Sequence, residues 1–161
     1  ATSRSGLPGW VDGDVLVGEG GRGHLFSPRA DYTDLEVRAQ VKISDGGNSG
    51  LYVRATPTGA WPEGYEAQIN SSFPDPQKSG SLYDLARVQT QLVPPDTWFD
   101  YHVICHDTDA GTSIEIRING VPLTRYVDPS RRHASGHIAF QQHHEGSVVE
   151  LREIYVRALD G

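Results

Sequence analysis

The 161-residue sequence predicts an all-β fold, a two-sheet antiparallel jelly-roll sandwich, and three observations predict it. Glycine (18 residues) and proline (10 residues) punctuate the chain at intervals of about 8 to 12 residues, as turns between short strands do. Between these residues, apolar and polar side chains alternate with a period of two. No segment sustains a helical period. Roughly ten to twelve short strands are expected, and two packed sheets let so many strands bury one face each.

The first predicted strands lie in the N-terminal third. The run DVLV (14–17) is strand-like, and GEGGRG (18–23) after it matches the dinucleotide-binding pattern by letter. Pro28 and the lack of a helical period downstream leave no helix N-terminus to hold a pyrophosphate, so we expect a turn-rich loop there. In LEVRAQVKI (35–43) apolar residues alternate with charged or amide residues, which predicts a half-buried strand.

Two further strands, GLYVRA (50–55) and GYEAQIN (64–70), are close enough in sequence to pair. Alternation predicts one core-facing set and one outward set. The core-facing set is Leu51, Val53, Ala55, Tyr65, Ala67 and Ile69. The outward set is Tyr52, Arg54, Glu66, Gln68 and Asn70.

The C-terminal half predicts a hairpin and a bulge. SIEIRING (113–120) ends in Asn119-Gly120, the residue pair of a type I′ turn, so VPLTRYV (121–127) is its return strand. In VVELREIYVRAL the apolar residues change phase between Leu151 and Ile154. One β-bulge near Arg152 or Glu153 reconciles the two phases.

Length and composition indicate a single β-sandwich domain over residues 1–161, with residues 1–8 as a loose lead-in. A net charge of −7 and a pI near 5.4 disfavour nucleic acid as a partner. Hydrophobic content of 37% and a mean hydropathy of −0.46, with no long apolar run, indicate no membrane partner. Because the sequence starts at Ala1 and lacks methionine, we expect a processed product or a module of a larger protein.

Cysteine and histidine patterns give little sign of a reactive thiol or a metal site. Cys105 is the single cysteine and shares the phase of neighbouring apolar residues, so a buried, inert thiol is expected, and no G-x-S-x-G motif is present. His137 and His143 would stand about 20 Å apart on one strand, while His144 would face away from His143. We therefore expect no metal and no cofactor, unless another strand supplies a ligand.

Outward-facing polar and aromatic residues suggest a carbohydrate partner. Tyr83 in SLYDLA and Gln141 and His143 in HIAFQQHH extend the set that begins with Tyr52 and Glu66. Aromatic rings stack on the C–H faces of sugars, and amides, carboxylates and guanidinium groups bind hydroxyl pairs. The alternative is structural: an Arg54–Glu66 cross-strand ion pair worth about 0.2 to 1 kcal/mol, with tyrosines that merely cover the sheet.

A family resemblance favours the carbohydrate interpretation. From about Val11 to Leu159, the ordered segments GGNSGLYVRA, GYEAQIN, PQKSGSLYDL, WFDYHVIC, IRINGVPLTRYVDP and GHIAFQQHHEGSVVELREIYV resemble the bacterial 3-keto-disaccharide hydrolase family, formerly a domain of unknown function. The resemblance implies a β-sandwich of the concanavalin A-like lectin/glucanase type. It also implies cleavage of glycosides whose glucose unit is oxidised at carbon 3, because the ketone acidifies the C2 proton and allows elimination at C1 followed by hydration.

The resemblance implies roles for seven residues on a concave sheet face. Glu66 and His143 are expected to be the acid/base pair, and Arg54 to hold Glu66 ionised and orient the substrate. The residues expected to bind hydroxyls are Tyr52, Gln68, Tyr83 and Gln141. The expected partner is a carbohydrate, either an oxidised glycoside or an oligosaccharide, and the expected location is periplasmic or secreted.

A second hypothesis keeps the same face without catalysis: a carbohydrate-binding, lectin-like module of a larger secreted or surface protein. A third, a purely structural interaction domain, is disfavoured because the polar side chains cluster without a large apolar patch to bury.

Overall fold

The computed structural model describes residues 10–11 and 14–159, so the predicted lead-in at residues 1–8 lies outside the described residues. The described chain is built of strands. They are β1 (Trp10–Val11), β2 (Leu16–Gly18), β3 (Gly23–Phe26), β4 (Leu35–Ile43), β5 (Ser49–Thr56), β6 (Glu63–Ile69), β7 (Phe99–Thr108), β8 (Gly111–Ile118), β9 (Val121–Asp128), β10 (His137–Gln142) and β11 (Val149–Ala158). Within these described ranges, no helix is long and apolar enough to cross a bilayer.

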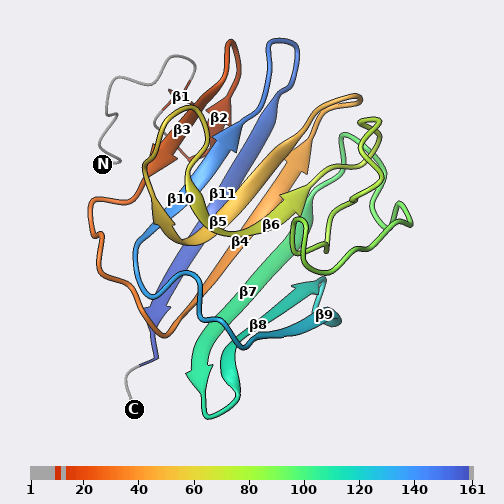
Figure 1. Ribbon diagram of the computed structural model, residues 1–161. Helices are drawn as coiled ribbons and strands as arrows, with labels where there is room; N and C mark the ends of the chain where they lie inside the picture. The colour runs from red at the N-terminus through yellow and green to blue at the C-terminus, as the bar shows by residue number, and fades with distance from the viewer. Residues whose placement is uncertain (1–9, 12–13, 160–161) are drawn as a thin grey trace.

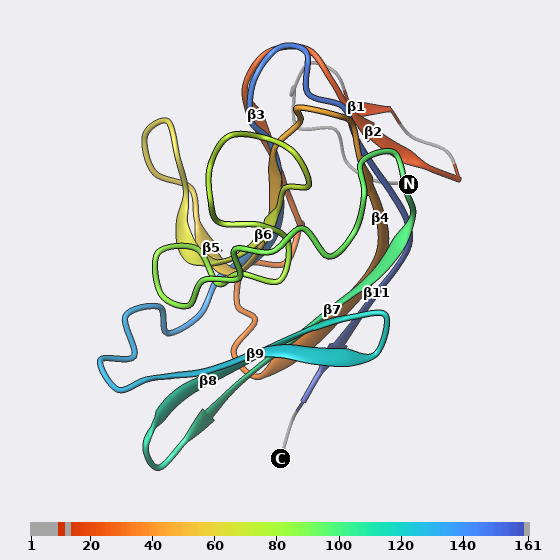
Figure 2. The ribbon, with the colours of Figure 1, turned by 90° about the vertical axis from the view of Figure 1, so that its right-hand side faces the viewer.

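The strands form two antiparallel sheets, which confirms the predicted sandwich. The large sheet has the order β1-β2-β11-β4-β7-β8-β9, and the small sheet has the order β3-β10-β5-β6 (Figure 1). Seen from the side, the large sheet curves so that β8 and β9 reach beneath the small sheet (Figure 2). The long segment between β6 and β7 lies beside the free edge of β6.

Period-two alternation builds the core, as the sequence predicts. Along β4 every second residue is buried, from Leu35 to Ile43. Leu51 and Val53 of β5 and Tyr65 of β6 meet these residues from the small sheet. The thiol of Cys105 is buried in the same core, and burial raises its pKa to about 12. It is the inert thiol that was predicted.

The predicted turn and bulge are both present. Asn119 and Gly120 have φ angles of 51° and 80°, which is the pair of positive values that a type I′ turn requires. In β11 the register with β4 shifts between Arg152 and Tyr155, and Glu153 has a φ of 51°. The bulge lets Ile154 pack against the core after the change of phase.

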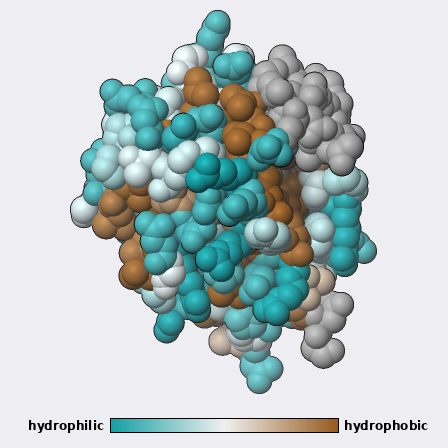
Figure 3. Space-filling view, turned by 180° about the vertical axis from the view of Figure 1, so that it is seen from behind, coloured by the Kyte–Doolittle hydropathy of each residue, from teal (hydrophilic) through white to brown (hydrophobic). Residues whose placement is uncertain are grey.

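Ion pairs cover the outer face of the large sheet. Lys42 pairs with Glu150 at 2.8 Å, and Arg38 pairs with Asp100 at 3.1 Å. Figure 3 shows hydrophilic side chains over much of this side of the molecule, with hydrophobic ones between them. The outer face of the small sheet differs, because loops wall it and leave a pocket.

Candidate functional site

A pocket of about 340 Å³ opens on the outer face of the small sheet. Strands β5, β6 and β10 form its floor, and loops form its walls. Its lining residues are Asn48, Tyr52, Trp61, Pro62, Glu63, Gly64, Glu66, Gln68, Tyr83, His133, Gln141 and His143. Among them are the predicted site residues Tyr52, Glu66, Gln68, Tyr83, Gln141 and His143, which the fold brings together.

Glu66 is the buried carboxyl group of the pocket. It is 8% exposed and lies opposite Tyr52 in the pairing of β5 with β6. A Cβ atom on Gly50 would overlap the Glu66 carboxylate, so the absence of a side chain at Gly50 makes room for it. Burial raises the pKa of Glu66 to about 8, while hydrogen bonds from Tyr52 and Gln141 oppose the shift. The carboxyl is therefore mostly protonated at neutral pH.

Tyr52 and Gln141 form a hydrogen-bonded pair beside this carboxyl. The Nε2 atom of Gln141 donates to the Tyr52 hydroxyl at 2.8 Å. Burial raises the pKa of Tyr52, and the neighbouring Glu66 raises it further. The hydroxyl consequently stays protonated and available as a donor.

His143 lies half-buried at the end of β10. Its Nδ1 atom is 2.9 Å from Nδ1 of His144, so one ring nitrogen is protonated and the other accepts. The prediction that His144 faces away from His143 is therefore wrong, because both residues follow the last residue of β10, where strand alternation no longer applies. Burial lowers the pKa of His143 below 6.5, and His144 lowers it further. The imidazole is therefore neutral at neutral pH and able to accept a proton.

The segment that follows β6 positions Gln68 and Tyr83. Its backbone pairs with the free edge of β6, since Tyr83 donates its N–H to the Glu66 carbonyl at 2.8 Å. Gln68 donates from Nε2 to the Gln77 carbonyl at 3.2 Å, and Asn70 donates to the same carbonyl at 3.0 Å. Tyr83 is 38% exposed, and its ring forms part of the pocket wall.

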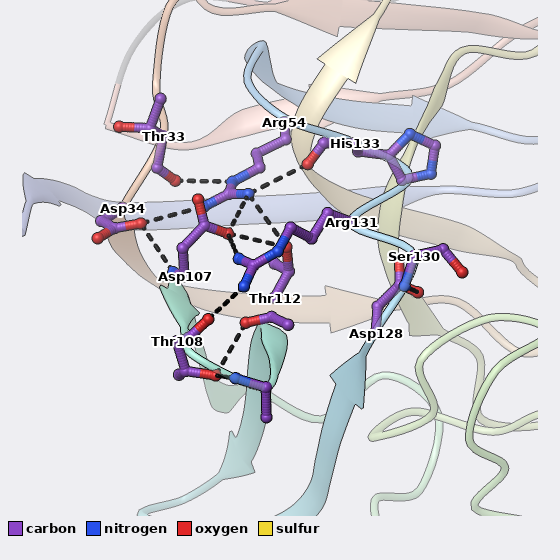
Figure 4. A network of polar contacts seen from close by, with 12 residues as sticks. Thr33, Asp34, Arg54, Asp107, Thr108, Thr112, Asp128, Ser130, Arg131 and His133 are labelled. Atoms are coloured by element: carbon purple, nitrogen blue, oxygen red, sulfur yellow. Dashed lines mark hydrogen bonds and ion pairs between the residues drawn. The ribbon is translucent and has the colours of Figure 1, made fainter.

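Arg54 is not in the pocket, and the prediction that it faces Glu66 is wrong. Its side chain is fully buried, and its guanidinium group pairs with Asp34 and Asp107, each at 3.1 Å. It also donates to the backbone carbonyls of Thr33 (2.8 Å) and His133 (3.1 Å) (Figure 4). Glu66 is thus not held ionised by a guanidinium group.

A β-bulge is the physical reason for this difference. Arg54 has a φ of 53°, and β5 carries one extra residue there relative to both β6 and β10. The extra residue reverses the alternation, so that Ala55, predicted to face the core, packs with Tyr52 and Ala139 on the outer face. The bulged backbone lies so close to Gly136 that no side chain fits there: a Cβ atom on Gly136 would overlap the backbone of Arg54 and Ala55.

Strand alternation did not predict the pocket residues that come from connections and strand ends, among them Asn48, Trp61, Glu63 and His133. The backbone of Asn48 is fixed by two hydrogen bonds with the Ser147 hydroxyl, each 3.0 Å. Its Oδ1 atom is buried and has no hydrogen-bond partner among the described residues. The pairing of residues 50–55 with residues 64–70 was predictable from the sequence. The connection between these two strands carries Trp61, so the pairing places Trp61 near the end of the sheet, but no pattern in the sequence turns its ring toward the pocket.

His133 reaches the pocket because its loop is anchored on both sides. Buried Asp128 accepts from the backbone N–H and Nε of Arg132, both at 3.0 Å, while Arg54 holds the His133 carbonyl. The His133 ring packs on Tyr65, with 4.7 Å between centroids. No local pattern in the sequence indicates this placement, because the anchors come from distant strands.

Metal ligation has no support in the geometry: within residues 10–11 and 14–159, no group of three or more His, Cys, Asp or Glu side chains is placed to hold a metal ion. The pocket can offer a protonated carboxyl, a neutral imidazole, and amide and phenol groups that bind hydroxyls. This set suits proton transfer on a polar, hydroxyl-rich ligand.

Several solved structures share the fold. A candidate glycosyl hydrolase from Parabacteroides distasonis aligns with a TM-score of 0.78 at 22% identity, covering 93% of this chain and 90% of that one. The carbohydrate-binding module CBM66 from Bacillus subtilis aligns with a TM-score of 0.70 at 14% identity, covering 92% and 90%. A legume lectin-like domain from Entamoeba histolytica aligns at 0.57 and 11%, covering 95% and 88%.

These likenesses confirm the lectin/glucanase type of sandwich. The same scaffold occurs in proteins that are named for binding and in one that is named for hydrolysis, so fold alone does not assign an activity. A comparison with curated proteins finds no match. The family resemblance is nevertheless confirmed: residues 3–157 match the family described as the 3-keto-alpha-glucoside-1,2-lyase-like domain, and the chain belongs to that family.

Proposed function

We propose that this protein cleaves 3-keto-glycosides in the pocket on the small sheet. Family membership supports the substrate class. The observation that carries the proposal is a pair of titratable groups in one pocket with pKa values moved in opposite directions, Glu66 upward and His143 downward. Environments that separate two pKa values in this way assign an acid and a base.

In the proposed reaction, neutral His143 accepts the C2 proton, which the C3 ketone acidifies. The electron pair of the C2–H bond forms a C1–C2 double bond as the C1–O bond breaks. Glu66 gives its proton to the departing oxygen. Water then adds at C1, and a proton returns to C2, which restores a 3-keto sugar and both protonation states of the protein.

Sugar hydroxyls find several partners around this pair. Tyr52 and Gln141 lie beside Glu66, while Gln68 and Tyr83 line the same pocket. The buried Oδ1 atom of Asn48, which has no hydrogen-bond partner in the described part of the chain, would accept from a sugar hydroxyl, because an unsatisfied buried acceptor costs about 1–3 kcal/mol. The proposal includes a periplasmic or secreted location, where oligosaccharides are processed.

Chromogenic substrates test the proposal. We expect 4-nitrophenol release from 4-nitrophenyl 3-keto-glucoside and none from its unoxidised parent. Glu66→Gln should lose about 10²- to 10⁴-fold in kcat on a 3-keto-disaccharide but much less on the 4-nitrophenyl substrate, whose leaving group departs without a proton. His143→Ala should lose activity on both. Full turnover by both variants would remove the pair from the mechanism.

A non-catalytic carbohydrate-binding module is the second candidate, and the fold shared with CBM66 favours it. In that case the pocket residues would bind a sugar and leave it intact. Saturable binding of the 3-keto-glucoside, seen as a shift in melting temperature without release of product, would support the module over the enzyme.

A further inference from the structure

A cluster of neighbouring rings lies at one side of the pocket, and we name it the aromatic ridge: Trp61, His143, Phe73 and His144. Neighbouring ring centroids in this order are each 5.3 Å apart, and those of His143 and His144 are 5.1 Å apart. Trp61 and His143 also line the pocket. The ridge therefore includes the proposed base, His143, and adds Phe73 and His144, which are not among the residues that line the pocket.

The ridge is accessible and supported from below. Trp61 is 42% exposed, and Phe73 and His144 are partly exposed. Buried His24 of β3 packs against Trp61 in a T-shaped arrangement, with 5.7 Å between ring centroids. The rings come from the β5–β6 connection, the loop after β6, and the end of β10, so three separate segments build one surface.

The ridge and the pocket differ in chemistry. The pocket presents the amides and the carboxyl that hydroxyl groups need. On the ridge, Trp61 and Phe73 offer mainly ring surface, and the Nδ1 atoms of His143 and His144 already contact each other. The ridge offers ring nitrogens in place of the amides and the carboxyl of the pocket, and a flat aromatic group can be held there by ring contacts, stacked or edge-to-face.

A positive charge lies at the same place. The Arg22 guanidinium group lies 5.2 Å from the centroid of the Trp61 ring, and no ion pair to it is present among the described residues. Its charge is felt at His143, whose pKa it helps to lower. A cation here would stabilise the negative charge that develops on a phenolic oxygen as it leaves.

We propose that the aromatic ridge is a leaving-group subsite for aromatic aglycones, so that aryl glycosides are the substrate class of this pocket. The inference rests on the proposed function, because it places the C1 substituent of the bound sugar against Trp61. The rigid indole stacks on or beside the aglycone ring, and Arg22 faces the oxygen released with it.

Two substrates of matched leaving-group acidity test this kinetically: the phenyl and the hexafluoroisopropyl 3-keto-glucosides. Trp61→Ala should raise KM for the phenyl substrate about tenfold and leave KM for the aliphatic one within about twofold. Trp61→Phe should keep most of the preference. Trp98→Ala is the matched control, since Trp98 packs on Lys42 and Arg152 elsewhere. Equal effects on both substrates would overturn the subsite.

A binding measurement separates this inference from the reaction. Calorimetric titration with unoxidised phenyl and methyl glucosides should show about tenfold tighter binding of the phenyl compound, lost in Trp61→Ala. If this preference holds without any turnover of keto substrates, the proposed reaction is wrong and the subsite stands. If the phenyl preference is absent, or if a disaccharide binds more tightly through Trp61, the aromatic subsite is overturned.

Discussion

The environment of Glu66 shows how one residue acquires its chemistry from its neighbours. Gly50 of β5, which lies opposite Gln68 and diagonal to Glu66, leaves the space that the carboxyl occupies. Tyr52 and Gln141 supply hydrogen bonds to it, and Asp84 and Asp75 add unfavourable negative charge. Because burial outweighs the hydrogen bonds, the balance favours the protonated form.

Replacement of Glu66 by Gln should stabilise the protein at high pH. In the unfolded chain this carboxyl titrates near 4.5, and burial raises its pKa to about 8 in the folded state. Below 4.5 both states are protonated, so the pKa difference costs nothing. As the pH rises from 4.5 to about 8, only the unfolded state releases its proton, so the free energy of unfolding falls, and it levels off above this range.

Urea denaturation of Glu66→Gln and of the wild type at about pH 4 and about pH 9 measures this effect. The variant should be more stable by a few kcal/mol at the higher pH and nearly equal at the lower one. Glu19→Gln is the control, because it makes the same change of side chain at an exposed loop position. A constant difference between variant and wild type at both pH values would contradict a raised pKa for Glu66.

At the scale of an element, the bulge in β5 decides which residues enter the site. The extra residue at Arg54 turns that side chain inward and leaves Tyr52 on the outer face. Inward Arg54 then joins three segments: the one that holds Thr33 and Asp34, the end of β7 at Asp107, and the loop that carries His133. Arg54 lies outside the pocket, but through the bulge it holds the loop that carries the pocket residue His133.

Arg54→Met should destabilise the fold by about 3 kcal/mol, the low end for a broken buried pair, because Asp34 and Asp107 remain partly solvated. Binding should weaken as well, since the His133 carbonyl loses its donor. Arg38→Met, which breaks the exposed pair with Asp100, should cost less than about 1 kcal/mol. Chemical denaturation compares the two. Equal small losses would show that the Arg54 network is not structural.

At the scale of the whole molecule, hydrogen bonds across the core fasten the two sheets near the pocket. Tyr101 of β7 donates to the Gln68 carbonyl of β6 at 2.6 Å and accepts from Gly80 at 2.8 Å. Tyr65 of β6 donates to Asp128 of β9 at 2.7 Å. The large sheet, which contributes no strand to the pocket floor, therefore fixes the strand that carries Glu66.

Tyr101→Phe should lower the free energy of unfolding by about 1–3 kcal/mol, because it leaves the buried Gly80 N–H without an acceptor. Tyr155→Phe, at a side chain that is 66% exposed, should change it by less than about 0.5 kcal/mol. Thermal or urea unfolding measures both. If the two variants behaved alike, the cross-core hydrogen bond would contribute nothing to stability.

Most of the fold was predictable because its signals are local. Each signal specifies one structure within a few residues: alternation in residues 35–43 specifies a strand, the Asn119-Gly120 pair a turn, and the change of phase after Leu151 a bulge. The second bulge, at Arg54, was missed because the sequence keeps its period there. The sequence Arg54-Ala55 does not indicate that Arg54 has a left-handed backbone conformation. That conformation is favoured only in the folded protein, where Asp34 and Asp107 pair with the guanidinium group and Gly136 leaves room for the backbone.

The sequence by itself determined the sandwich and the outward placement of Tyr52, Glu66, Gln68, Gln141 and His143, because alternation within a strand fixes the face on which each residue lies. Tertiary structure alone decided that Arg54 leaves this face and that Asn48, Trp61 and His133 join it. Those placements depend on ion pairs, hydrogen bonds and close backbone approaches between segments far apart in the chain. The alternation of residues within one strand carries no information about such contacts.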